Sequence, residues 1–305
     1  MLTYILQRLL WLVPVLIVVA AITFTLMHLV PGGPWDSNRR LPPAAEENLN
    51  RRYGLDKPLP EQFVDYLGDL AQGDLGVSYR ALNRPVRDII WDGARVSFTL
   101  GLLALIAAVG VGVPLGMMAA LRQNTAVDYL SVGFVSIGAS MPAFVTGMLL
   151  LVVFSAELHW LPTAGWGSPK QAIMPVIALS ILPAAYIARV TRASMLEVLQ
   201  QDYIRTARAK GLREQAIVLR HVVRNGLIPV LTVIGPVAAA LVTGSFIVES
   251  LFAIPGIGRS FVTSIGARDY GVIMGTTLFY TIIVVIFNLI VDVLYVFVDP
   301  RIRYR

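Results

Sequence analysis

The sequence has no cysteine and little charge. Without cysteine, a disulfide framework, a thiolate metal site and a cysteine nucleophile are all excluded. Only 14% of the 305 residues are charged, whereas about 25% are charged in an ordinary globular domain. Hydrophobic residues make up 56% of the chain, and the mean hydropathy is +0.69. This composition predicts an integral membrane protein.

The local motifs of common catalytic and nucleotide sites are also missing. None of the three lysines, Lys57, Lys170 and Lys210, lies in a G-x-x-x-x-G-K-[ST] loop, so we expect no ATP site of the P-loop kind. No G-x-S-x-G or H-E-x-x-H motif indicates a hydrolase or a metalloprotease. We therefore predict no catalytic residue, which argues against a membrane enzyme.

Histidine is equally scarce. His28, His159 and His221 are too far apart in the chain to form an i, i+3 or i, i+4 ligand pair on one helix. His28 and His159 could both lie near the outer face, but two isolated histidines are more often ordinary interfacial residues. We predict no metal site and no cofactor in this chain.

What the chain does contain is six long uncharged runs. About 20 apolar residues in a helix cross the hydrocarbon core of a membrane, which is about 30 Å thick. The first run is too long for a secretory signal and is followed by no small-residue cleavage site, so we expect it to be retained. We predict an all-α membrane protein whose six transmembrane helices are roughly Leu9–Val30, Val96–Leu121, Tyr129–Ala156, Gln171–Ala188, Asn225–Val248 and Val272–Val291.

A polar segment separates the first two runs. The chain is therefore predicted to have three parts. Residues 1–30 contain the N-terminus and the first transmembrane helix, residues 31–95 form an insertion, and residues 96–305 form a five-helix core. Turn residues predict three short helices in the insertion: one that ends at Gly54, one from Pro60 to Gly73, and one that starts near Pro85. The insertion is either a cap that packs on the membrane helices or a docking surface.

The distribution of Lys and Arg predicts the orientation of the chain, because these residues concentrate in short cytoplasmic loops. If the N-terminus is inside, the inside segments hold 13 basic residues and the short outside loops hold three. Both termini are therefore predicted to be cytoplasmic. The helical insertion, and the loops at residues 157–170 and 250–271, are predicted to be extracytoplasmic.

Acidic residues are almost absent from the long runs, with the exceptions of Asp292 in the sixth and Glu249 at the end of the fifth. Such acids can belong to a proton relay. We favour the alternative that both lie near helix ends and pair with an arginine or cap a helix. An ion-coupled secondary carrier would bury more polar ligands in the middle of its spans, so their scarcity argues against that class.

The segment from Glu197 to Pro229 is the only long basic, helix-forming stretch between two apolar runs. A first helix is predicted to end at Lys210 and Gly211, because a cation in the last turn and a following glycine are typical of a helix C-terminus. A second helix is expected from about Glu214 to Arg224 and should end at Asn225–Gly226. An apolar stripe is expected on the first helix, made of Leu196, Leu199, Tyr203 and Ala207.

Two short helices bent at a glycine would form a protrusion suited to docking a soluble partner. The alternative is that the basic residues only anchor the segment to anionic lipid. Binding to nucleic acid is not expected, because a basic balance in a membrane protein usually reflects cytoplasmic anchoring.

The two expected helices, at about residues 197–228, resemble the cytoplasmic coupling motif of permeases from binding-protein-dependent ABC importers of the dipeptide, oligopeptide and nickel subfamily. The resemblance rests on RTARAKGL (Arg205–Leu212) and HVVRNGLIPV (His221–Val230). The whole sequence looks most like the B-type membrane subunit of an oligopeptide permease. Further similar patches are VPGGP (Val30–Pro34), GDLGVSY (Gly73–Tyr79), HWLPTAGW (His159–Trp166), VTRASMLEVL (Val190–Leu199), IVESLFAIPGIG (Ile247–Gly258), RDY (Arg268–Tyr270) and VDVLYVFVDPRIRY (Val291–Tyr304).

The coupling consensus of that family begins Glu-Ala-Ala and has a glycine four positions after the second alanine. This chain keeps the glycine at Gly211 but replaces the Glu, and its proline comes late, at Pro229. The resemblance implies that the ATPase coupling residues are Arg205, Thr206, Ala207, Arg208, Ala209, Lys210 and Gly211.

The resemblance also implies the type I ABC importer fold, a place in the bacterial inner membrane and a set of partners. These are a second, C-type permease subunit, two ATP-binding subunits that hold ATP and Mg, and an extracytoplasmic solute-binding protein that delivers a peptide. This chain would form half of the membrane pathway. The same type of importer could instead carry a nickel chelate or glutathione. The lining of the pathway is not assigned by the sequence, and Met141, Phe144 and Asn288 are candidates only.

Overall fold

The computed structural model describes residues 2–35, 43–81 and 84–298. Over these residues the chain is built from helices, and its sole strand-like pairing is an isolated bridge between Val77 and Pro85. It divides into two compact units, Met1–Ser97 with Pro255–Ile286 and Phe98–Ile254 with Phe287–Arg305. Two long helices, α4 (Val86–Leu121) and α14 (Tyr270–Val298), contribute residues to both units.

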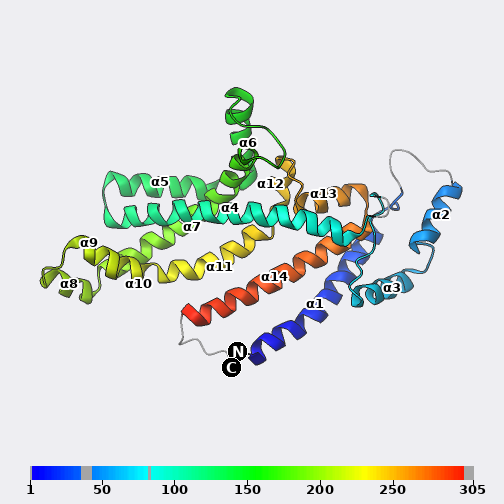
Figure 1. The fold of residues 1–305 in the computed structure, drawn as a ribbon, viewed down its shortest axis with the longest axis horizontal. Helices are drawn as coiled ribbons and strands as arrows, with labels where there is room; N and C mark the ends of the chain where they lie inside the picture. Colours follow the sequence, from blue (N-terminus) through cyan, green and yellow to red (C-terminus); the bar gives the residue numbers. More distant parts are fainter. Residues whose placement is uncertain (1, 36–42, 82–83, 299–305) are drawn as a thin grey trace. The chain divides into compact units, whose positions relative to one another are not determined.

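The first unit contains α1 (Leu2–Leu29), α2 (Pro43–Tyr53), α3 (Leu59–Ala71), the start of α4, α13 (Ile257–Ala267) and most of α14 (Figure 1). Its core joins α1 to α14 through Ala20, Met27, Tyr270, Ile273, Met274 and Leu278. Phe63, Tyr66 and Leu70 on one face of α3 pack against this core. The middle helix of the insertion therefore packs on the membrane helices through the face that carries these three side chains.

Three of the sequence patches that are far apart in the chain meet in the first unit. The carboxylate of Asp269 accepts hydrogen bonds from the hydroxyl of Ser78 and, at 3.0 Å, from the backbone N–H of Tyr79. The guanidinium of Arg80 donates to the backbone oxygens of Ala267 at 2.8 Å and Pro34 at 2.9 Å. These bonds fasten both ends of the insertion to the turn between α13 and α14.

The second unit contains α5 (Ala126–Ser140), α6 (Ala143–Leu150), the π-helical η1 (Leu151–Glu157), α7 (Pro169–Leu199), α11 (Ile228–Val242) and α12 (Phe246–Leu251). Helix α5 runs beside the second part of α4 (Figure 1), and it also contacts α7. Glycines permit the close approach of α4 to α7. A Cβ placed on Gly112 would lie 2.6 Å from the backbone oxygen of Ala184, and one on Gly116 would lie 2.4 Å from that of Ala188.

Among the described residues, five helices are long and apolar enough to cross a membrane, and there are six spans if one bent pair of helices is counted as a span. These findings confirm the all-α class and the expected number of spans. The third expected helix, Tyr129–Ala156, is wrong as a continuous element, because α5 and α6 meet at 103° across Met141 and Pro142. Proline at position 142 lacks the N–H that would continue the helix.

Three further boundaries differ from the sequence prediction. The helix expected near Pro85 is not separate, because it continues without a break through α4. The expected loop at residues 250–271 contains the helix α13. The fourth span is longer than the uncharged run at Gln171–Ala188, since α7 continues through Arg189 and Arg192 to Leu199. Counting uncharged residues ended the span too early because both arginines lie within the helix.

Candidate functional site

The candidate functional site is the basic segment between α7 and α11, which we call the coupling segment and define as residues 197–228. It begins where α7 ends at Leu199, and a turn at Gln200–Gln201 leads into α8 (Asp202–Ala209). The single apolar stripe expected from Leu196 to Ala207 is therefore wrong, because its residues lie on two helices. Tyr203, which the stripe placed inside, is 44% exposed, and Ile204 is fully buried in its place.

The coupling segment has its own apolar core. Its buried members are Ile204 and Ala207 from α8, Ile217 and Val222 from the following helix, Met195 from α7 and Ala120 from α4. Burying a side chain as large as Ile stabilises a fold by about 1.5–3 kcal/mol. This core therefore packs the coupling segment against the ends of α4 and α7.

Gly211 forms the bend. Helix α8 ends at Ala209, Lys210 is its C-terminal cap, and Gly211 has φ +74°. A residue with a Cβ would be strained in this left-handed conformation. Nothing lies within 4 Å of the position that a Cβ on Gly211 would take. The expected helix end is confirmed, and the outer side of the bend is open.

The second expected helix is present with an irregular middle. It consists of α9 (Glu214–Ile217), the π-helical η2 (Val218–Val223) and α10 (Arg224–Gly226). The Nδ2 amide of Asn225 donates a hydrogen bond of 3.2 Å to the hydroxyl of Tyr203, which joins this helix to α8. At the other side, a Cβ on Gly226 would lie 2.8 Å from Cγ of Met195 in α7. The glycine therefore permits direct contact between the second helix and α7.

One ion pair spans the bend. Arg208 donates to Glu214 at 2.7 Å and 3.2 Å, and both side chains are about half exposed. The hydrogen bond from Arg208 lowers the pKa of Glu214, and the same bond raises the pKa of Arg208. An exposed pair of this kind contributes about 1 kcal/mol or less.

The seven expected coupling residues do not share one environment. Ala207 is buried in the apolar core, so it supports α8 from beneath. The exposed members are Arg205, Thr206, Arg208, Ala209, Lys210 and Gly211. They form the accessible side of α8 and its bend, which is where a partner protein can make contact.

The other residues singled out in the sequence lie elsewhere. Glu249 is fully buried in α12, and Asp292 lies half-buried in α14. Nδ1 of His28 is 2.8 Å from the backbone oxygen of Phe24, and Nδ1 of His159 is 3.1 Å from that of Glu157. Among the described residues, no group of three or more His, Cys, Asp or Glu side chains is arranged to hold a metal ion.

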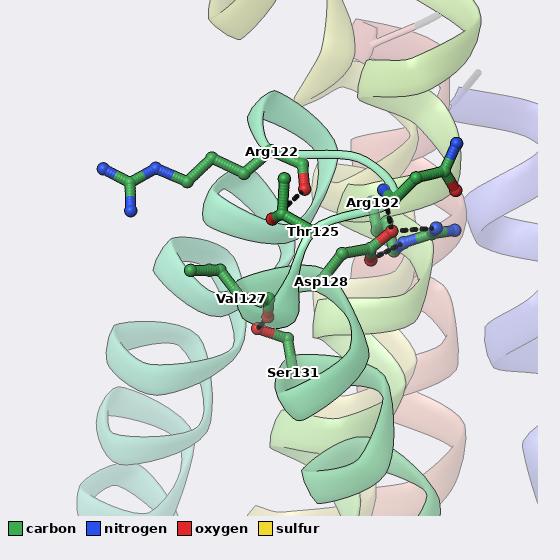
Figure 2. A network of polar contacts seen from close by, with 7 residues as sticks. Arg122, Thr125, Val127, Asp128, Ser131 and Arg192 are labelled. Atoms are coloured by element: carbon green, nitrogen blue, oxygen red, sulfur yellow. Dashed lines mark hydrogen bonds and ion pairs between the residues drawn. The ribbon is translucent and has the colours of Figure 1, made fainter.

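The polar contacts of the second unit that sequence reasoning missed include the ion pair between Asp128 and Arg192 (Figure 2). Asp128 immediately precedes the uncharged run that begins at Tyr129, so it was not counted as an acid within a span. One signal for this pair was available in the sequence. Asp128 and Arg192 have opposite charges, and each lies near the end of one of two consecutive uncharged runs. Nothing local in the sequence shows that the two side chains meet.

The fold is that of the membrane subunits of ABC importers. It superimposes on a chain of the inward-facing MetNI methionine ABC transporter with a TM-score of 0.57 and 19% identity, covering 69% of this chain and 96% of that one. A chain of an amino acid ABC transporter with histidines gives a TM-score of 0.55 and 16% identity, covering 68% and 93%. At these identities the likeness concerns the fold alone.

Sequence comparison identifies the family. The family described as "Binding-protein-dependent transport system inner membrane component" matches residues 112–304, and its N-terminal counterpart matches residues 1–98. The chain therefore belongs to this family of multi-pass inner-membrane transport proteins. It is 44% identical to the dipeptide transport system permease protein DppB of Bacillus subtilis, covering 98% of this chain and 97% of that one. It is 43% identical to the oligopeptide transport system permease protein OppB of Escherichia coli K12, with complete coverage of both.

Proposed function

We propose that this chain is a permease subunit of an ATP-driven, binding-protein-dependent importer and forms half of the membrane pathway for peptide uptake. The observation that carries the proposal is identity of 43–44% over essentially the full length to permeases named for dipeptide and oligopeptide transport. The chain itself would hydrolyse no ATP. The ATP and Mg would be held by partner subunits.

The coupling segment is the element we assign to docking an ATPase subunit. Its exposed side combines Arg205, Arg208 and Lys210 with the open bend at Gly211. Its opposite side is buried against α4 and α7. A short helix held in this way transmits the movement of a docked protein to the membrane helices as a rigid body. Anchoring to lipid alone would require the basic residues but not an open glycine bend.

The remaining partners follow from the same assignment. A second, C-type permease subunit would complete the pathway, and two ATPases would dock, one on each permease. A solute-binding protein would deliver the peptide to the side that carries α2 and α3. This arrangement places both termini and the coupling segment in the cytoplasm, in agreement with the excess of basic residues on that side.

The test is a pull-down from mild detergent of the tagged wild-type chain and two glycine variants, with mass spectrometry of the chains that co-purify. Gly211→Trp places a large side chain at the proposed contact. Gly73→Trp is the matched control, because Gly73 also has a positive φ, of +79°, with nothing within 4 Å of an added Cβ, and lies in the insertion. The two variants carry similar backbone strain.

We expect wild type and Gly73→Trp to recover a second permease and P-loop ATPases, and Gly211→Trp to lose the ATPases. Retention of the ATPases by Gly211→Trp would contradict the docking assignment. A homo-oligomer without any ATPase in the wild-type sample would instead favour an ion-coupled secondary carrier.

Uptake in a strain that lacks the gene, with and without a plasmid-borne copy, tests the substrate. A labelled tripeptide should accumulate only when the chain is present. Accumulation of labelled nickel or glutathione, but not of the tripeptide, would assign the chain to an importer of the same type with a different cargo.

A further inference from the structure

The side chains of Asp128 and Arg192 join α5 to α7 in the second unit. Nε of Arg192 donates to Oδ1 of Asp128 at 2.7 Å, and Nη2 donates to Oδ2 at 2.8 Å, so the contact is bidentate (Figure 2). The backbone N–H of Asn124 donates a third hydrogen bond to Asp128 at 3.0 Å. Asp128 is 3% exposed and Arg192 is 29% exposed.

The turn before α5 is shaped to deliver Asp128 to this contact. Asn124 has φ +61°, a left-handed conformation that asparagine tolerates better than most residues. The hydroxyl of Thr125, at the N-terminus of α5, donates to the backbone oxygen of Arg122 at 2.6 Å (Figure 2). The guanidinium of Arg122 points away from Asp128 (Figure 2). The turn thus presents one buried carboxylate to one arginine of α7.

Arg192 is next to the coupling segment on α7. Met195 lies three residues further along this helix and belongs to the buried core that holds α8 and the second helix. Thr191, the residue before Arg192, faces α4. A Cβ on Gly116 of α4 would lie 2.6 Å from Cβ of Thr191. The arginine is therefore fixed on the part of α7 that packs closest to α4 and to the coupling segment.

The opposite end of α5 is also close to α7, but through apolar atoms. A Cβ on Gly138 would lie 2.9 Å from Cγ2 of Ile181. Such an apolar contact sets no specific pairing of atoms, because the hydrophobic effect is non-directional. A bidentate arginine–carboxylate contact has a fixed geometry and is lost when its partners are displaced.

We propose that Asp128 and Arg192 are positioning residues that make α5 move as one body with α7 when the coupling segment is displaced. The break at Met141 and Pro142 follows directly after α5, so α5 carries the start of α6 with it. Movement of the coupling segment then reaches the bent pair of helices through a charged contact. The inference rests on the proposed docking of an ATPase to the coupling segment.

The first test compares variants of the complete complex, reconstituted with its solute-binding protein in liposomes. Asp128→Asn combined with Arg192→Gln removes both charges together, which avoids leaving an unpaired buried charge. Arg122→Gln is the matched control, because it removes an arginine from the same turn that does not contact Asp128. Uptake of a labelled tripeptide and ATP hydrolysis are measured on the same vesicles.

We expect the double variant to retain its ATPases and its melting temperature, and to lose about tenfold in peptide molecules taken up per ATP hydrolysed, a loss within the usual range of allosteric coupling. The control should match wild type. A purely stabilising role of the pair predicts normal uptake per ATP once the double variant is folded, and that result would overturn the inference. Absence of ATPases from the wild-type complex would overturn the proposed function instead.

A second test measures the wild-type pair first, so its main result does not depend on how well the double variant assembles. Because the chain has no cysteine, two can be introduced for spin labels at Leu130 in α5 and Tyr186 in α7, both of which are exposed. On trapping the complex with ADP and vanadate, the distance between the labels should change by no more than about 2 Å, the size of a small helix shift. In the double variant the distance should change further. A large change in wild type would show that α5 and α7 move separately.

Discussion

The hydroxyl of Ser78 donates a hydrogen bond to the carboxylate of Asp269, which lies 191 residues further along the chain. The backbone N–H groups of Tyr79 and Arg80 point at the same carboxylate, at 3.0 Å and 3.4 Å. One buried acid therefore organises the end of the insertion and places it on the turn before α14. Asp269 is only 3% exposed, so these donors take the place of the water that would otherwise hydrogen-bond to it.

Replacement of Asp269 by Asn should loosen the insertion. Hydrogen bonds to a charged group contribute about 1.5–3 kcal/mol each, and the neutral amide would present an N–H to donors in place of one acceptor oxygen. We expect faster proteolysis of the insertion and a lower melting temperature of the purified chain. The control is Asp69→Asn on the exposed side of α3, which should leave both measurements unchanged. Equal behaviour of the two variants would contradict the anchoring role of Asp269.

The sequence predicted the membrane helices well because their signal is local. A run of some 20 uncharged residues is visible within one window, and each expected run corresponds to a helix or a bent pair. The coupling segment was also visible, since Lys210 and Gly211 mark a helix end by their own chemistry. What was missed depends on distant partners. The RDY patch was noted, but no pattern within it shows that Asp269 meets Ser78.

The close approach of α4 to α7 should make Gly116 intolerant of substitution. A Cβ there would lie 2.4 Å from a backbone oxygen, which cannot move aside without shifting α7. We expect Gly116→Ala to destabilise the purified chain by about 1–3 kcal/mol, the usual cost of overpacking. Gly110→Ala in the same helix is the control, because nothing lies within 4 Å of its added Cβ. That variant should be as stable as wild type or slightly more stable, by thermal unfolding in detergent.

The pair of Arg208 and Glu214 should contribute only weakly and in a pH-dependent way. Because the pKa of Glu214 is lowered in the folded state, its contribution is present above the unfolded pKa of about 4.3 and is lost as the pH falls through the folded pKa. At pH 7 and low salt, Glu214→Gln should cost about 1 kcal/mol or less. Thermal unfolding at pH 7 should show this difference, and it should shrink at high salt and below pH 4. A larger cost at pH 7 would indicate that Glu214 makes a second contact.

Asp292 separates an ATP-driven importer from an ion-coupled carrier. If ATP supplies the energy, Asp292→Asn should leave the initial rate of peptide uptake within about twofold of wild type, because Asp292 lies beyond the apolar span Tyr270–Ile290 and is then structural. Uptake should also persist when a protonophore collapses the proton gradient while ATP is maintained. Loss of uptake in both experiments would make Asp292 part of an ion path and would reject the importer.

The contact between Gly226 and Met195 yields a prediction about the coupling segment as a unit. An added Cβ at Gly226 would lie 2.8 Å from Cγ of Met195, whose side chain is fully buried, so Gly226→Ala should displace the second helix from α7. We expect this variant to lose ATPases in the pull-down even though residue 226 is buried within the chain. Met195→Ala removes the obstructing atom. Because residues 195 and 226 are in contact, the effects of the two substitutions should be non-additive. The double variant should recover more ATPase than Gly226→Ala alone, because the added methyl then occupies the space that Met195 vacates. Additive losses would mean that the second helix is held by its other contacts, and that docking depends on α8 without support from α10.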